Sequence, residues 1–178
     1  MPLLALSVLA QIRDDVIPVE VIGLGSIVLV VITLIHGAGL DSIVTHYKKR
    51  AETLRRKSRH PQIAMFVFAG SILLMLFLHM AEICLWGFVL RGTHLIASLR
   101  DSIYFSANTY TTLGMGPMDL PHAWRELGPI MAIAGLFTFA WTTSEMFNIV
   151  GYHHDLIAEL GVKRQQRLAS RSEAHKMP

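Results

Sequence analysis

The sequence is short of the residues that common enzyme and disulfide signatures need. It contains one cysteine, Cys84, among 178 residues, which excludes an intrachain disulfide and a C-x-x-C metal or redox site. The glycine pair at 114–116 lacks the Lys-Ser/Thr of a phosphate-binding loop, and Cys84 lies in an apolar run without an evident base. We therefore expect neither an enzyme nor an organic cofactor.

Charged residues are scarce in three long stretches. The chain is 52% hydrophobic with a mean hydropathy of +0.45, which is high for a soluble domain of this length. The apolar stretches cover 19–40, 63–90 and 127–150, and a bilayer core of about 30 Å needs about 20 helical residues. The sequence predicts an all-α integral membrane protein with three transmembrane helices.

The basic residues are concentrated at two places. Seven of the sixteen lysines and arginines fall at 48–59 and five follow residue 160. The positive-inside rule places both clusters in the cytoplasm and the N-terminus outside, here across a bacterial inner membrane. The segment before residue 19 lacks the basic start of a cleaved signal peptide.

These clusters lie beside apolar spans, so we expect the lipid bilayer, and no nucleic acid, as their partner. Whether 48–59 only orients the chain or also binds anionic lipid stays open.

The outer segment between the second and third spans predicts a re-entrant pore loop over 98–121. Its sequence "SLRDSIYFSANTYTTLG" favours a helix of about ten residues, with Ser98 or Asp101 as the N-cap and Gly114 ending regular structure. Backbone without helical hydrogen bonds is tolerated at membrane depth only inside protein or along a water-filled path. We therefore expect this loop to line a water-filled path.

The stretch "YFSANTYTTLGMG", followed by an apolar span, resembles the pore loop of the potassium-channel family, whose filter usually reads T-V-G-Y-G-D. The chain is similar to small bacterial channel-like proteins with an extra N-terminal helix before the two-helix pore unit. That resemblance divides it into an N-terminal helix and basic loop at 1–60, a pore domain at 61–155 and a basic tail at 156–178. The matching filter residues are Thr112, Leu113, Gly114, Met115 and Gly116.

The resemblance implies a passive, potassium-conducting homotetramer. Backbone carbonyls of Thr112 to Met115 would hold K⁺, with the Thr112 hydroxyl at the inner end. Glycine at 114 and 116 suits this chemistry, because carbonyls converge on an ion only if the backbone alternates its conformation. One chain supplies one loop, so a closed ring of ligands needs several copies around an axis.

Two residues depart from the family pattern. Met115 replaces the tyrosine that packs behind the filter and hydrogen-bonds to the pore helix, and Pro117 replaces the aspartate, with Asp119 two positions later. Methionine has no O–H, so the outer filter would be held less firmly. A non-selective cation pore and a non-conducting regulatory or structural subunit stay open as alternatives.

Polar residues recur along the third span. Gly135, Thr138, Thr142 and Glu145 share much of one helical face, and the resemblance gives Gly135 the place of a gating glycine. That face either lines the pore or has hydroxyls bonded to their own helix, with Glu145 snorkelling or pairing with an arginine.

His79 and Glu82 form an i, i+3 pair of ionisable residues inside the second span. A metal site would need a further ligand, for which His36 and His94 are the candidates, but the topology places His36 towards the opposite side. We therefore expect a structural pair that joins the second span to the pore helix. Its candidate partners are Tyr104, Asn108 and Trp86.

His153, His154 and Asp155 follow the third span. They are either solvated groups at the helix end or, since histidine titrates near neutrality, a proton sensor.

Overall fold

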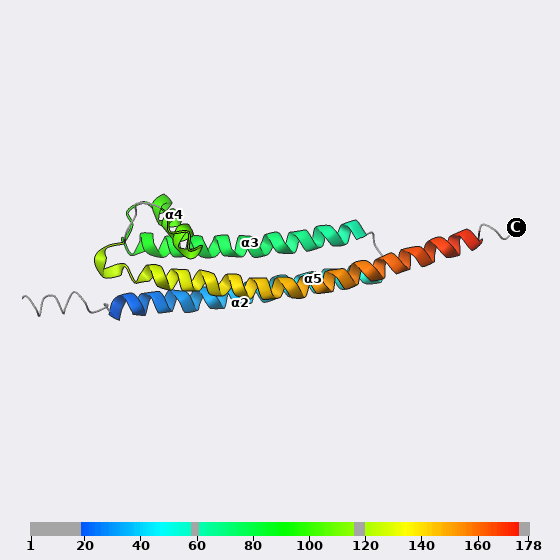
Figure 1. Ribbon diagram of the computed structural model, residues 1–178, viewed down its shortest axis with the longest axis horizontal. Helices are drawn as coiled ribbons and strands as arrows, with labels where there is room; N and C mark the ends of the chain where they lie inside the picture. The colour runs from blue at the N-terminus through cyan, green and yellow to red at the C-terminus, as the bar shows by residue number, and fades with distance from the viewer. Residues whose placement is uncertain (1–18, 58–60, 116–119, 175–178) are drawn as a thin grey trace, which may run out of the picture. The chain divides into compact units, whose positions relative to one another are not determined.

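The computed structural model describes residues 19–57, 61–115 and 120–174. These residues form helices and connecting turns without any strand, as expected for an all-α protein. Four α-helices are labelled in Figure 1: α2 (Val19–Lys57), α3 (Pro61–Gly92), α4 (Leu99–Tyr110) and α5 (Leu127–Ala174). The short 3₁₀ helix η1 (His122–Trp124) precedes α5.

The three long helices α2, α3 and α5 are each long and apolar enough to cross a membrane, as expected from the three apolar stretches. Two of them continue well past their apolar stretches. α2 runs through the basic cluster to Lys57, because that cluster contains lysine, arginine and glutamate, which are good helix formers, and no proline or glycine. α5 likewise reaches Ala174.

The short helix α4 begins where the sequence indicates. Ser98 is its N-cap, with an extended backbone (φ −103°, ψ 132°) and a side chain that accepts a hydrogen bond from the Asp101 N–H at 3.4 Å. This bond satisfies one of the amides that a helix start leaves without a partner.

The described residues divide into two compact units. Unit 1 contains those up to 36 and those from 79 to 139, and unit 2 contains 37–78 and those from 140 onwards. Each unit has its own hydrophobic core, around Trp86 and Met131 in unit 1 and around Tyr47 and Leu156 in unit 2. Each unit takes a part of all three long helices, and the linear division at 60 and 155 stays a prediction.

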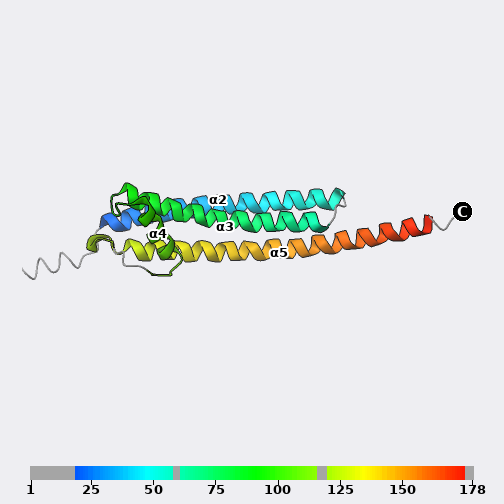
Figure 2. The same cartoon turned by 90° about the horizontal axis from the view of Figure 1, so that it is seen from above.

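Two glycines of unit 1 bring α4 into close contact with its neighbours. A Cβ on Gly87 of α3 would lie 3.1 Å from the Cα of Ile103, and a Cβ on Gly135 of α5 would overlap the carbonyl oxygen of Tyr110. Figures 1 and 2 show α4 beside the C-terminal end of α3, and in Figure 2 it lies between α3 and the N-terminal part of α5. The absence of side chains at these two positions is what lets the backbones approach.

Candidate functional site

The C-terminal end of α4 is capped by the first two residues of the expected filter. The Thr112 N–H donates to the Thr109 carbonyl at 3.0 Å and the Leu113 N–H to the Asn108 carbonyl at 2.8 Å. This bond pattern is a Schellman cap, in which the residue after the C-cap takes a left-handed conformation and is usually glycine. Here that residue is Thr112, with φ +58°. A β-branched residue is strained in this conformation, and such strain clusters at functional sites.

The expected filter residues that the structure describes are solvent-exposed within the single chain. Thr112, Leu113, Gly114 and Met115 are all exposed, with 60% of Leu113 and 63% of Met115 accessible. Gly114 has φ +65°, a conformation that glycine adopts without strain. Gly116, Pro117 and Asp119 lie outside the described residues.

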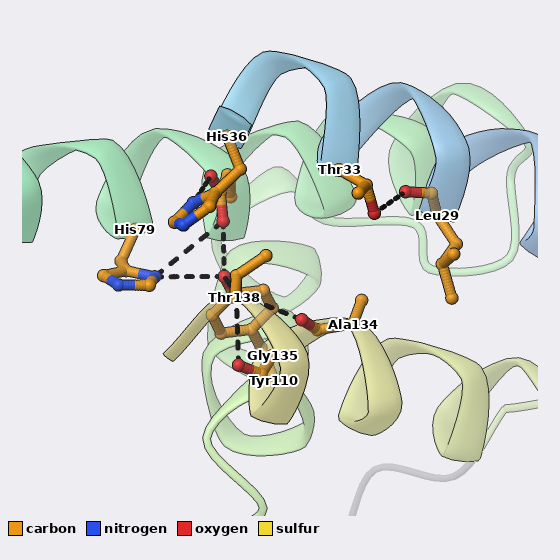
Figure 3. Close-up of polar contacts among 9 residues, drawn as sticks. Leu29, Thr33, His36, His79, Tyr110, Ala134, Gly135 and Thr138 are labelled. Atoms are coloured by element: carbon orange, nitrogen blue, oxygen red, sulfur yellow. Dashed lines mark hydrogen bonds and ion pairs between the residues drawn. The ribbon is translucent and has the colours of Figure 1, made fainter. Parts of the chain in front are cut away.

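A buried polar network surrounds the hydroxyl of Tyr110, the last residue of α4, in unit 1 (Figure 3). The carboxylate of Glu82, 1% exposed, contacts His36 Nδ1 at 2.7 Å through Oε1 and accepts a hydrogen bond from the Tyr110 hydroxyl through Oε2. His79 Nδ1 lies 3.2 Å from the Tyr110 hydroxyl, and Thr138 Oγ1 lies 2.5 Å from it. The network therefore connects α2, α3, α4 and α5 at the last residue of α4.

The hydroxyl groups of this network have more hydrogen-bond acceptors than protons. The Tyr110 O–H donates to Glu82, and the one Thr138 O–H lies within reach of the Ala134 and Gly135 carbonyl oxygens as well as of the Tyr110 oxygen. The network thus buries the carboxyl group of Glu82 beside two histidines. A buried charge is costly unless an opposite charge accompanies it.

The position of His36 differs from the sequence-based expectation, which was wrong. It was expected towards the opposite side of the membrane from His79 and Glu82, but its ring lies 5.2 Å from that of His79 and bonds to Glu82. The apolar stretch at 19–40 is part of a longer helix, α2, so the end of the stretch does not mark the membrane depth of His36.

Tyr110 is the residue that sequence reasoning missed. The candidate partners named for the His79–Glu82 pair were Tyr104, Asn108 and Trp86, yet Tyr104 is 52% exposed and the Asn108 amide bonds to the Tyr104 carbonyl. Tyr110 is fully buried, and so are Ser106, one turn earlier, and Ser102, two turns earlier. This spacing of four is the signal that marks the packed face of α4.

The residues expected to line the pore have different surroundings. Gly135 and Thr138 are buried in unit 1 against Tyr110, so within this chain they pack against α4. Thr142 and Glu145 are half-buried in unit 2, where Glu145 accepts a hydrogen bond from Asn148 at 3.2 Å. A place in the pore lining or the gate stays a prediction for all four residues.

The histidines after the third span differ from each other. His153 is buried in unit 2, where its ring stacks on Phe68 at 4.4 Å and its Nδ1 lies 3.1 Å from the Tyr47 hydroxyl. His154 and Asp155 are exposed. His153 is therefore a packed residue of the unit 2 core and not a solvated group at a helix end.

Comparison with protein-family models, curated proteins and solved structures finds no match to this chain. The function is therefore argued from the residues and their geometry.

Proposed function

We propose that the chain is one subunit of a passive monovalent cation channel, a homotetramer that conducts K⁺ through a filter formed by Thr112 to Gly116. The proposal depends on the packing of α4 and the exposure of the loop that follows it. A short helix between two membrane-spanning helices packs against both of them at Gly87 and Gly135, and the chain that leaves it is exposed from Thr111 to Met115.

An exposed loop of this kind needs a polar partner inside a membrane. Backbone amides and carbonyls that lack helical hydrogen bonds are tolerated there only beside protein, water or an ion. Copies of the same loop around a symmetry axis would supply rings of carbonyl oxygens, which replace the hydration shell of a cation. The positive φ of Gly114 supports this role, because a ring of carbonyls requires such a change of backbone direction.

Tyr110 compensates in part for the hydroxyl group that Met115 lacks. Met115 has no hydroxyl with which to bond to the pore helix, whereas Tyr110 fixes the end of that helix from within through Glu82 and Thr138. The anchored point lies two residues before Thr112. We infer that the inner end of the filter is held more firmly than the outer end, and that potassium over sodium selectivity is weaker than in a filter with tyrosine.

The helix cap favours the second candidate, a non-conducting subunit. Thr112 and Leu113 use their amides to close α4, so the first two filter residues belong to the cap within a single chain. A conducting filter needs their carbonyls to face the axis of the assembly. The two candidates differ in whether assembly of the subunits turns the Thr112 and Leu113 carbonyls towards the axis.

Planar-bilayer recording of the purified protein tests the proposal. In a potassium gradient, the currents should reverse near the potassium equilibrium potential. When sodium replaces potassium on one side, weak selectivity should bring the reversal potential closer to zero. Gly114→Ala should abolish the current, because alanine is disfavoured at φ +65°. Gly92→Ala is the matched control, since a Cβ there meets nothing within 4 Å. Silence of the wild type at every voltage, with assembly intact, would support the non-conducting subunit.

A further inference from the structure

His36, His79 and Glu82 can act together as metal ligands. Each offers one ligand atom, these atoms lie within 4.8 Å of one another, and all three residues are buried. Two come from one turn of α3 and the third from α2, so only the folded chain brings them together. The sequence argued against a metal here solely because His36 was expected elsewhere, and its position beside Glu82 removes that objection.

We propose that these three residues bind a divalent transition-metal ion of the zinc type, with the Tyr110 hydroxyl in the fourth position. Two imidazole nitrogens and a carboxylate oxygen are ligands that zinc accepts in a tetrahedral site. At zinc–ligand distances of about 2.0–2.1 Å, neighbouring ligand atoms lie about 3.4 Å apart. The contacts of 2.7, 3.2 and 3.8 Å among the ring nitrogens, the two Glu82 oxygens and Tyr110 lie on both sides of that value. The ligand atoms of His36, His79 and Glu82 lie within 4.8 Å of one another, so the side chains must move closer together to hold an ion.

The charge of the network gives an independent reason for a cation. Among the described residues, those that pair with Glu82 are His36, His79 and Tyr110. None of them carries a permanent positive charge, and Glu82 is buried. A divalent ion bound through Nδ1 of both histidines would face the Glu82 carboxylate, with the ring proton of each histidine on Nε2. A carboxylate buried in a protein is normally paired with a positive charge or bound to a metal.

The site is enclosed, which assigns it a structural role. His36, Tyr110 and Thr138 are each 0% exposed and His79 is 2% exposed, so no position is open to a substrate. The ion would tie α2 and α3 to the last residue of α4. This inference stands on unit 1 alone and does not require that the protein conducts ions.

Metal content of the full-length protein tests the proposal. The protein is purified in detergent with its affinity tag removed, stripped with a chelator, loaded with Zn²⁺ and desalted. We expect about one ion per chain by mass spectrometry, and the intense visible absorption of tetrahedral cobalt when Co²⁺ replaces Zn²⁺. A wild type that retains no ion, or a Co²⁺ spectrum typical of octahedral hydration, would overturn the proposal, and neither readout requires a variant to fold.

Variants then assign the ligands. His36→Gln and His79→Gln should each weaken Zn²⁺ binding by about tenfold or more. His46→Gln and His122→Gln, which change exposed histidines, should leave it unchanged. Equal losses in both sets would show surface binding and overturn the site. If the ligand variants fail to fold, competition of Zn²⁺ with Co²⁺ in the wild type decides, because a shared site loses the cobalt absorption as zinc is added.

Discussion

Tyr110 and Thr138 join the end of α4 to α5 through hydroxyl oxygens 2.5 Å apart. The same tyrosine donates to Glu82 of α3, so one phenol oxygen holds the helix that precedes the exposed loop. A buried polar group at such a junction fixes a position more sharply than apolar packing does, because the alternative is an unsatisfied group.

Removing the Tyr110 hydroxyl should destabilise unit 1. Tyr110→Phe leaves Glu82 without one of its donors in a buried site, at a cost of about 1–3 kcal/mol. Thermal unfolding in detergent should show a lower midpoint than the wild type. Tyr104→Phe is the control, since Tyr104 is 52% exposed, and equal midpoints for the two variants would contradict the anchoring role.

Gly135 should not tolerate a side chain. Gly135→Ala places a Cβ against the Tyr110 carbonyl oxygen, so α4 must move away from α5, which we expect to destabilise the protein by about 1–3 kcal/mol, as overpacking does. Gly151→Ala in the same helix meets nothing within 4 Å and should be neutral or stabilise by up to about 1 kcal/mol. Unfolding midpoints of the pair, measured side by side, decide whether this contact is as close as described.

Substitutions of Thr112 should affect protein stability and potassium current differently. Thr112→Gly relieves the strain of a β-branched residue at φ +58° and should stabilise the protein by about 1 kcal/mol, yet it removes the hydroxyl proposed for the inner filter. Thr112→Ser keeps that hydroxyl. We expect reduced potassium current for the glycine variant only. A current that survives in the glycine variant at the wild-type level would remove Thr112 from the ion path.

Met115→Tyr should sharpen selectivity. The introduced O–H restores the donor that the resembled filters use to bond to the pore helix, so the outer filter would be held more firmly. The reversal potential in mixed potassium and sodium should move towards the potassium equilibrium potential. An unchanged reversal potential would show that residue 115 does not set selectivity here.

Short-range features were predictable from the sequence, and contacts between helices were not. The apolar stretches gave three long helices, and Ser98 gave the start of α4, because hydropathy and capping depend on neighbouring residues. His36 was misplaced because the offset of one helix along another depends on side-chain packing, which the ends of apolar stretches do not report. Tyr110 was overlooked because its partners come from two other helices.

The division into two units constrains the order in which the protein forms during synthesis. Each unit draws residues from α2, α3 and α5, so neither has its complete set of contacts until the last helix has been made. Until α5 has been made, the part of each core that α2 and α3 contribute is therefore uncovered on one side. Chains interrupted before α5 would lack both cores at once, whereas in proteins built from consecutive domains the first can fold while the next is being made.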